Sequence, residues 1–326
     1  MRAIAVPKPG GPEALQLVDV PSPVAGPGQV RILVTAAGVN RADVLQRQGL
    51  YPPPRGTSDI IGLEVAGRID AIGEGTRTTL KPGDPVVALL AGGGYAEYAV
   101  APAGQCAPVP TGIGLIEAAG IMETAATVVS NFDLLRVDQG DTVLVHGGAG
   151  GIGSFAIPYA KHLGCTVITT VGSAAKAKHA RTLGADLATD YHGDWAGEVR
   201  DATDGRGVDA ILDIIGAKYL EANVSLLARG GRMVVIGLQG GTKGTLDLNQ
   251  LLTKAATISA TSLRFRPLEE KAAIVRKVAH DVWPLFTSGA IPLPPLTTYP
   301  LADAGAAHQR LESGDNVGKI VLVVRG

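Results

Sequence analysis

The sequence predicts an α/β protein in two parts, a doubly wound parallel sheet and a separate, barrel-like antiparallel β domain. Three observations lead to this prediction. A short apolar run at residues 143–145 breaks into glycines and is followed by a helix-length segment. From about residue 120 to 263, strand-length and helix-length segments alternate, as in a parallel sheet covered by helices on both faces. Before that, short runs rich in Val, Ile and Tyr are separated by Pro/Gly clusters, which is typical of compact antiparallel domains.

The glycine-rich segment carries the clearest functional signal. Residues 143–145 predict a buried strand, and residues 154–163 predict a helix that ends at Gly164. Between them lies a G-x-G-x-x-G pattern formed by Gly148, Ala149, Gly150, Gly151, Ile152 and Gly153. Such glycines let the backbone approach a pyrophosphate, which binds at the N-terminus of the following helix. An ordinary glycine-rich turn is the alternative, but the strand–turn–helix context favours a dinucleotide-phosphate site.

Composition limits the possible classes of protein. The chain has 326 residues, of which 46% are hydrophobic and 18% charged, so it can form two domains with cores of their own. With a net charge of −1 and no basic run, it is not expected to bind nucleic acid. No apolar segment approaches the ~20 residues that cross a bilayer, and Pro7 and Lys8 interrupt the N-terminal apolar stretch. We therefore expect a cytoplasmic globular protein without a membrane segment or signal peptide.

The end of the second strand in the predicted parallel sheet indicates which dinucleotide binds. In sites that prefer NADH, an acidic residue at this point holds the ribose 2′-hydroxyl. Residues 169–178 contain no Asp or Glu but supply Ser173 and Lys176, a hydroxyl and a cation suited to a 2′-phosphate. Tyr191, at the end of the next strand, can pack beside the same group. These residues predict NADPH, with a solvated helix residue as the alternative for Lys176.

After residue 263 the alternation of strands and helices ends, and two further elements are expected. A helix is expected at residues 267–286, where Pro267 opens the segment and Glu269 and Glu270 fall in the first turn. The chain ends in a strand, KIVLVV, at residues 319–324.

Several phrases of the sequence resemble a known family. They are GVNRADVLQRQGLYPPP at residues 38–54, GLEVAG at residues 62–67, and the shorter HGGAGGIG, VGSAAK and VGKIVL. All resemble the zinc-independent quinone oxidoreductases, the zeta-crystallin-like branch of the medium-chain dehydrogenase/reductase superfamily. The resemblance implies a Rossmann doubly wound parallel sheet and a GroES-like antiparallel β-barrel. It places the catalytic GroES-like domain at residues 1–123 and 265–326, and the dinucleotide-binding Rossmann domain at residues 124–264.

Departures from the zinc alcohol dehydrogenases of that superfamily concern the metal. Those relatives have a Cys where this chain has Asn40 and a His where it has Leu63, so Glu64 is interpreted as a ligand position left without partners. A catalytic zinc ion needs about three N, S or O side-chain ligands, and both cysteines lie outside these motifs. We therefore expect no metal site. Without a Lewis acid, hydride can still reach an acceptor that is already electron-poor, such as a quinone.

The resemblance also assigns the remaining site residues. It implies that the amide of Asn40 faces the nicotinamide, that Tyr51 stacks on the substrate or donates a proton, and that Thr127 contacts the nicotinamide. Leu238 and Leu263 correspond to positions that line the nicotinamide. The alternatives are structural: an Asn that satisfies a turn, an aromatic residue in a surface loop, and core leucines.

Three further polar residues are expected in structural roles or remain open. His146 ends a strand, where a hydrogen-bonded structural residue is expected, and Glu64 is expected to stabilise the fold. Asp213 ends a buried strand, and structural and functional roles are equally open for it.

Three functions are compatible with these residues. The first is an NADPH-dependent quinone oxidoreductase. The second is an NADPH-dependent reductase of enoyl thioesters or enones, in which Tyr51 would be more nearly essential because the α carbon needs a proton. The third is a non-catalytic NADPH-binding protein. By resemblance, the strand at residues 257–263 lies at the sheet edge and pairs across a two-fold axis, so a homodimer is expected.

Overall fold

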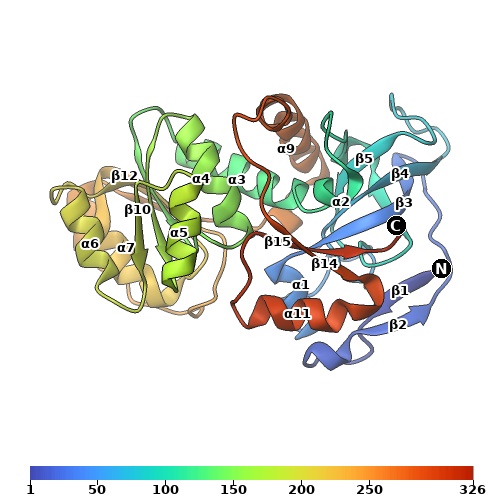
Figure 1. Ribbon diagram of the computed structural model, residues 1–326, viewed down its shortest axis with the longest axis horizontal. Coiled ribbons are helices and arrows are strands. Elements are labelled where there is room, and N and C mark those ends of the chain that lie inside the picture. Colours follow the sequence, from blue (N-terminus) through green and yellow to red (C-terminus); the bar gives the residue numbers. More distant parts are fainter. Residues whose placement is uncertain (326) are drawn as a thin grey trace. The chain divides into compact units, whose positions relative to one another are not determined.

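The computed structural model describes residues 1–325, which form two compact units (Figure 1). Unit 1 comprises Met1–Ala126 and the chain from Leu263 onward, and unit 2 comprises Thr127–Ser262. Unit 2 contains a parallel sheet with helices, and unit 1 contains a separate, largely antiparallel sheet, so the predicted fold class is confirmed. Among these residues, no helix has both the length and the apolar character needed to cross a membrane.

The sheet of unit 1 is built around one long strand, β3 (Gln29–Val39). Its first residues alternate, with Val30, Ile32 and Val34 buried in the core, whereas its last four residues are all buried. The strand therefore enters the interior just before Asn40. The other strands of this unit are β1 (Arg2–Ala5), β2 (Gln16–Asp19), β4 (Glu64–Ile72), β5 (Pro85–Leu89), β6 (Tyr98–Pro102), β7 (Cys106–Pro108), β14 (Leu296–Pro300) and β15 (Lys319–Val323).

Strand pairing brings distant parts of the chain to the end of β3. On one side, β15 runs antiparallel to β3 with Ile320 opposite Val39. On the other side, β4 runs antiparallel to β3 with Val65 opposite Ala37. As a result, the first residues of β15 and β4 meet beside the end of β3, although 255 positions separate them in the sequence.

Short helices connect the strands of unit 1. They are α1 (Arg41–Arg47), α2 (Leu115–Ala118), α9 (Leu268–Asp281), α10 (Trp283–Thr287) and α11 (Ala304–Glu312). The single helix expected at residues 267–286 is thus two helices that meet at Val282. The cause is Pro284, which has no N–H for the carbonyl of His280 and whose ring clashes with that carbonyl in a continuous helix.

Unit 2 is a doubly wound sheet with the strand order β10-β9-β8-β11-β12-β13, and all its pairings are parallel. Because crossovers between parallel strands are right-handed, α4 and α5 pack together on one face and α6 and α7 on the other (Figure 1). The strands are β8 (Thr142–His146), β9 (Thr166–Val171), β10 (Leu187–Asp190), β11 (Val208–Asp213), β12 (Leu227–Val235) and β13 (Thr257–Ala260). Helix α3 (Met122–Leu135) begins in the last residues of the first segment of unit 1 and continues into unit 2. The other helices of unit 2 are α4 (Gly151–His162), α5 (Ala174–Thr182), α6 (Trp195–Ala202), α7 (Leu220–Leu226) and α8 (Leu248–Lys254).

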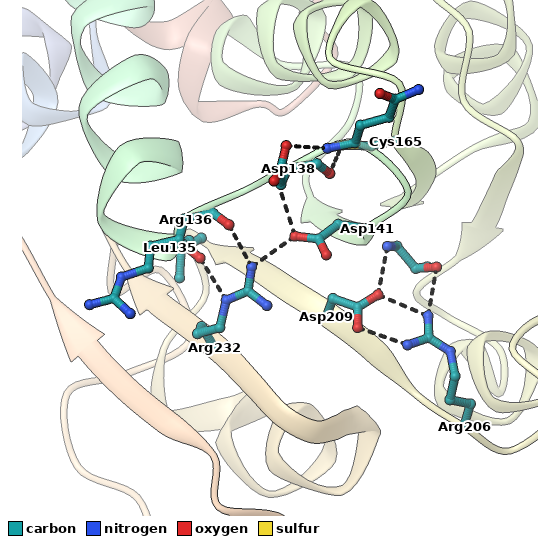
Figure 2. Close-up of polar contacts among 10 residues, drawn as sticks. Leu135, Arg136, Asp138, Asp141, Cys165, Arg206, Asp209 and Arg232 are labelled. Carbon is teal, nitrogen blue, oxygen red and sulfur yellow. Dashed lines mark hydrogen bonds and ion pairs between the residues drawn. The ribbon is translucent and has the colours of Figure 1, made fainter.

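Arg232, on β12, fastens the end of α3 to the parallel sheet (Figure 2). Its guanidinium donates to the carbonyls of Leu135 and Arg136 and to the carboxylate of Asp141, at 2.6, 2.8 and 2.8 Å. Arg136 has a φ of 51°, so α3 ends in a left-handed residue. A cation at the C-terminal end of a helix satisfies its last carbonyls and interacts favourably with the helix dipole. This contact fixes the direction in which the chain enters β8.

The end of α8 offers a test of backbone strain. Ala255 closes this helix with φ 49° and ψ 37°, a left-handed conformation that costs a residue with a Cβ about 1–2 kcal/mol. Replacement Ala255→Gly should raise the free energy of unfolding by about 1 kcal/mol, measured by urea denaturation. The same change at Ala273, which is exposed in the middle of α9, should lower it by about 1 kcal/mol. Equal effects at the two positions would contradict the prediction.

Candidate functional site

The glycine-rich segment connects a parallel strand to a helix. After β8, Gly147 turns the chain with a φ of 79°, and α4 begins at Gly151 with Gly150 as its N-cap. The backbone N–H groups of Gly147 and Gly148 both donate to the carbonyl of Thr170 on β9, which holds the turn against the sheet. The first N–H groups of α4 have no acceptors within the helix, so an anion can bind there.

The three glycines of the pattern have different steric surroundings. A Cβ at Gly148 would collide with the side chain of Thr169, and a Cβ at Gly153 would collide with the backbone of Gly148. The turn itself therefore requires these two glycines. At Gly150, a Cβ would have only the carbonyl oxygen of Gly147 nearby, at 3.6 Å, which is an ordinary contact. This side of the turn is open to a ligand.

The residues predicted to bind a 2′-phosphate lie at the carboxyl ends of β9 and β10. Ser173 is the N-cap of α5, and its Oγ accepts the backbone N–H of Lys176 at 3.3 Å. Its hydroxyl can still donate a hydrogen to another group. Tyr191 follows β10, and its hydroxyl lies so close to Gly172 that a Cβ there would collide with it. The structure thus brings Tyr191 next to the residue that precedes Ser173.

Asp213 holds the loop after β11. Its two carboxylate oxygens accept the N–H groups of Ile215 and Gly216 at 2.7 and 3.0 Å, and burial raises its pKa to about 6. Gly216 has a φ of 78°, and a Cβ there would lie 2.9 Å from Leu238 Cδ2. Asp213 thus holds the loop after β11, whose carbonyls of Ile214 and Ile215 accept the N–H groups of Gln239 and Gly240, next to the exposed Leu238.

His146 is buried among hydrogen-bonding partners at the end of β8. Its Nε2 lies 2.8 Å from Asn223 Oδ1, and its Nδ1 lies 3.0 Å from Thr170 Oγ1. Because an amide oxygen only accepts, Nε2 carries the hydrogen and the Thr170 hydroxyl donates to Nδ1. Burial lowers the pKa of His146 to about 4. The ring is therefore neutral at pH 7, with both nitrogens engaged, as expected of a structural residue.

Two of the residues expected near the nicotinamide, Thr127 and Leu263, lie in helix α3 and in a short turn after β13. Thr127 is buried in α3, and its carbonyl accepts the amide of Asn131, whose Oδ1 accepts the hydroxyl of Thr261. Leu263 begins a short 3-10 turn, Leu263–Phe265, since β13 ends at Ala260. Leu263 thus follows the strand instead of ending it.

Asn40 belongs to a buried polar cluster in unit 1. Its Oδ1 accepts a hydrogen bond from Lys319 Nζ at 2.6 Å, and its Nδ2 donates to Glu64 Oε1 at 3.0 Å. Lys319 Nζ also donates to Glu64 Oε1, at 2.8 Å. Lys319 and Glu64 are the first residues of β15 and β4, so the pairing of these strands with β3 assembles the cluster.

Glu64 thus has polar partners in the interior, which fits the stabilising role expected for it. Besides Lys319 and Asn40, it accepts the backbone N–H of Glu123, at the start of α3, through Oε2 at 2.9 Å. Gly38 leaves room for it, because a Cβ there would collide with the Glu64 carboxylate. In the described chain, residues 1–325, no group of three or more His, Cys, Asp or Glu side chains could hold a metal ion.

A second buried network begins at the backbone of Asn40. Asp43 Oδ2 accepts the N–H of Asn40 at 2.7 Å and the hydroxyl of Tyr95 at 3.1 Å. Tyr95 also contacts His308 Nε2 at 3.1 Å, and Arg47 Nη1 lies 3.4 Å from His308 Nδ1. Burial raises the pKa of Asp43 to about 7 and lowers the pKa of His308 to about 3. This network fixes the start of α1, and with it the position of Asn40.

The loop that carries Tyr51 is attached to a buried arginine. Arg264 donates to the carbonyls of Ala91 and Tyr51, at 2.8 and 3.2 Å, and to Gln46 Oε1 at 2.7 Å. Its guanidinium carbon lies 5.2 Å from the centre of the Tyr51 ring, within cation–π range. Phe265 packs edge-on against the same ring, with the centroids 5.4 Å apart. The ring of Tyr51 is therefore held in place from two sides.

Sequence reasoning did not identify Lys319, Arg264 or Asp43 as parts of the site. Lys319 was visible in the phrase VGKIVL as a cation at the start of an otherwise apolar strand, which calls for a buried partner. Asp43 falls three residues after Asn40, the spacing of a helix N-terminal cap. No comparable local signal marks Arg264, because its partners come from three other segments.

Comparison with known proteins agrees with this arrangement. The model of zinc-binding dehydrogenases matches residues 151–278, and that of the alcohol dehydrogenase GroES-like domain matches residues 26–111. A mycobacterial protein solved in complex with NADPH is 37% identical, with a TM-score of 0.90, over 99% of this chain and 100% of its own. The quinone oxidoreductase of Escherichia coli complexed with NADPH is 30% identical, with a TM-score of 0.88, over 99% of this chain and 100% of its own.

A different kind of relative is found among curated proteins. The phthioceranic/hydroxyphthioceranic acid synthase of Mycobacterium bovis is 32% identical over 320 residues, which cover 96% of this chain. The chain spans only 15% of the length of that synthase.

The steric difference among the glycines gives a test of ligand binding. In Gly150→Ala the new methyl group fits the turn but occupies its open side, so the Kd for NADPH should rise about tenfold or more, measured by fluorescence titration. The free energy of unfolding should change by less than about 1 kcal/mol. The matched control is Gly193→Ala, where a Cβ also has one backbone carbonyl at 3.6 Å, and it should leave both quantities unchanged. Wild-type affinity in Gly150→Ala would rule out this turn as the pyrophosphate site.

Proposed function

The chain belongs to the medium-chain dehydrogenase/reductase superfamily, in the branch of the zinc-independent quinone oxidoreductases, and we propose that it reduces a quinone with NADPH. The Asn40 cluster is the observation that carries the proposal. Where zinc-dependent relatives have a cysteine ligand, this chain has an amide held by a buried lysine and a buried glutamate. Such an amide can donate a hydrogen bond to an acceptor oxygen, which suits a substrate that is reduced without a Lewis acid.

Unit 2 has the features that NADPH requires. The open side of the turn at Gly150 and the first N–H groups of α4 suit a pyrophosphate. Ser173 offers a hydroxyl donor and Lys176 a cation for the 2′-phosphate, and Tyr191 lies next to the preceding residue, Gly172. Two similar structures are NADPH complexes. Bound NADPH would supply the hydride, and the residues proposed to contact its nicotinamide are Thr127, Leu238 and Leu263.

The remaining residues orient the acceptor and supply a proton. Reduction of a quinone places negative charge on its carbonyl oxygen, and an N–H of Asn40 is proposed to stabilise that charge. The ring of Tyr51, fixed by Arg264 and Phe265, offers a flat surface for stacking. A tyrosine hydroxyl at this place can donate a proton to the reduced product.

A reductase of enoyl thioesters is the second candidate, and one observation favours it. The chain matches a segment of a synthase that is named for a phthioceranic acid product, and a thioester-bound enoyl group is an electron-poor acceptor of the same kind. The α carbon of that substrate must receive a proton after hydride addition, which makes a proton donor more important than in quinone reduction.

Parallel assays distinguish these functions. NADPH oxidation is followed at 340 nm with 9,10-phenanthrenequinone, 1,4-benzoquinone and crotonyl-CoA, and each assay is repeated with NADH. We expect fast oxidation of NADPH with a quinone and little with crotonyl-CoA or NADH. Turnover of the thioester alone would replace the proposal by enoyl reduction. No turnover with any acceptor, in a protein that binds NADPH, would make it a non-catalytic binding protein.

Tyr51→Phe also distinguishes quinone reduction from enoyl reduction, because it keeps the ring and removes the hydroxyl. In quinone reduction we expect kcat to fall less than about fivefold, whereas in enoyl reduction it should fall by about 100-fold, the usual contribution of a general acid. Phe265→Leu, which removes a ring that supports Tyr51, is the control for altered stacking. Equally large losses with both acceptors in Tyr51→Phe would refute the distinction.

We also propose that the protein forms a homodimer through β13. This strand ends the sheet of unit 2 and has a partner on one side only, β12, among the described strands. The preceding helix, α8, exposes Leu248 and Leu252, with 68% and 77% of their surfaces accessible. An open edge beside exposed leucines favours pairing with a second copy.

Light scattering at micromolar concentration tests this proposal, with twice the mass of the chain as the expected result. Leu252→Glu places a charge on the proposed contact and should shift the protein toward monomer. Leu268→Glu is the matched control, because Leu268 is also exposed but lies on α9 in unit 1, and it should leave the mass unchanged. A monomeric wild type would overturn the proposal.

A further inference from the structure

We propose that Lys319 is a positioning residue, which fixes the orientation of the Asn40 amide and strengthens it as a hydrogen-bond donor. This inference rests on the proposed contact between Asn40 and the acceptor. It assigns to Lys319 a part in the reaction in addition to its pairing with Glu64.

The orientation of the amide follows from the chemistry of its two neighbours. A lysine ammonium only donates hydrogen bonds, and a carboxylate only accepts them. Lys319 Nζ lies 2.6 Å from one end of the Asn40 amide, and Glu64 Oε1 lies 3.0 Å from the other. The end that faces Lys319 must therefore be Oδ1, and the end that faces Glu64 must be Nδ2. Rotating the amide by 180° would place its N–H groups against the lysine ammonium and its oxygen against the carboxylate, so that two donors and two acceptors would face each other.

The surroundings hold both neighbours in place. Lys319 and Glu64 have 3% and 0% of their side-chain surfaces exposed, and each begins a strand that pairs with β3. The other oxygen of Glu64 is bonded to the N–H of Glu123. Neither side chain can turn away without losing a charge partner in the interior, which is costly. The amide of Asn40 is thus fixed in one orientation.

This orientation leaves one group to act on a ligand. The Nδ2 atom carries two hydrogens, and the bond to Glu64 Oε1 uses one of them, which leaves the second for a ligand among the described residues. The ammonium on Oδ1 draws electron density from the amide, which makes the remaining N–H a stronger donor. Lys319 therefore acts on the acceptor through Asn40, without touching it.

A purely structural role for Lys319 makes a different prediction. If Lys319 only compensates the charge of Glu64, then removing both charges together would preserve the fold and the activity. The neutral pair Glu64→Gln/Lys319→Met makes this change without leaving one charge unpaired. It removes the ammonium from Oδ1 and lets a Gln amide meet Asn40 in either orientation.

The experiment is a mutant cycle between this neutral pair and Asn40→Ala, read as kcat with the quinone that the wild type reduces. We expect the neutral pair to lower kcat about tenfold, less than the ~10²–10³ lost with a whole donor, with the Kd for NADPH unchanged. In the Asn40→Ala background, the neutral pair should cause little further loss, because its effect passes through Asn40. Wild-type kcat in the neutral pair, or independent losses that multiply, would overturn the inference.

Lys254→Met is the control for lost stability. Lys254 donates to three backbone carbonyls near the end of α7, in unit 2, so its replacement should lower the melting temperature and leave kcat unchanged. If the neutral pair does not fold, Glu64→Gln/Lys319→Gln takes its place, since the two glutamine amides keep hydrogen-bond partners around Asn40 without a charge. A lower kcat is then expected, because the ammonium on Oδ1 is lost, and a wild-type kcat would overturn the inference.

A second measurement does not depend on turnover. The chain has five asparagines, so selective ¹⁵N labelling gives few side-chain amide signals, and Asn40→Ala identifies that of Asn40. In the wild type we expect two well-separated proton shifts with slow hydrogen exchange, and in the neutral pair a smaller separation with faster exchange. If the wild type reduces neither quinone nor thioester, the proposed function fails, while unchanged Asn40 signals in the neutral pair would refute the positioning by Lys319.

Discussion

Unit 1 depends on an ion pair that lies entirely in its interior. Burying a carboxylate and an ammonium costs several kcal/mol for each ion. The contact between Glu64 and Lys319 is therefore stable only because other groups form hydrogen bonds with the remaining carboxylate lone pairs and ammonium hydrogens. Asn40 and the backbone of Glu123 do so for Glu64, and Asn40 and the carbonyl of Val39 do so for Lys319. The ends of β3, β4, β15 and α3 thus meet at one point, and each is held there by the others.

The turn of unit 2 depends on steric fit between backbone segments instead of on buried charges. Gly148 and Gly153 allow strand and helix to approach so closely that a single methyl group would collide. Gly150 has no such constraint, although it completes the same sequence pattern. The turn therefore explains Gly148 and Gly153 by itself, and for Gly150 we propose the pyrophosphate as the reason.

The two units differ in how much of them the sequence could predict. The strand–glycine–helix unit is local: its steric requirements act between neighbours in the chain, so residues 141–164 were interpretable by themselves. The single helix predicted at residues 267–286 is two helices, because Pro284 cannot donate the hydrogen bond that would continue α9. Lys319 could not be placed, because its position beside Asn40 follows from the register of two strands that are far apart in the sequence. Arg264 is similar, since it joins Gln46, Tyr51 and Ala91 only after the chain has returned to unit 1.

The second buried network shows how a fixed direction of hydrogen bonding supports the first. Arg47 always donates, so His308 accepts through Nδ1; the neutral ring then donates from Nε2 to Tyr95, whose hydroxyl donates to Asp43. Both Nη1 and Nη2 of Arg47 also donate to the partly exposed carboxylate of Glu312. Every donor along this line points toward Asp43, which also accepts the backbone N–H of Asn40. The backbone of Asn40 is thus fixed by one network and its side chain by the other. A residue held twice in this way keeps its amide in one orientation, and the acceptor that we propose for Asn40 must fit that orientation.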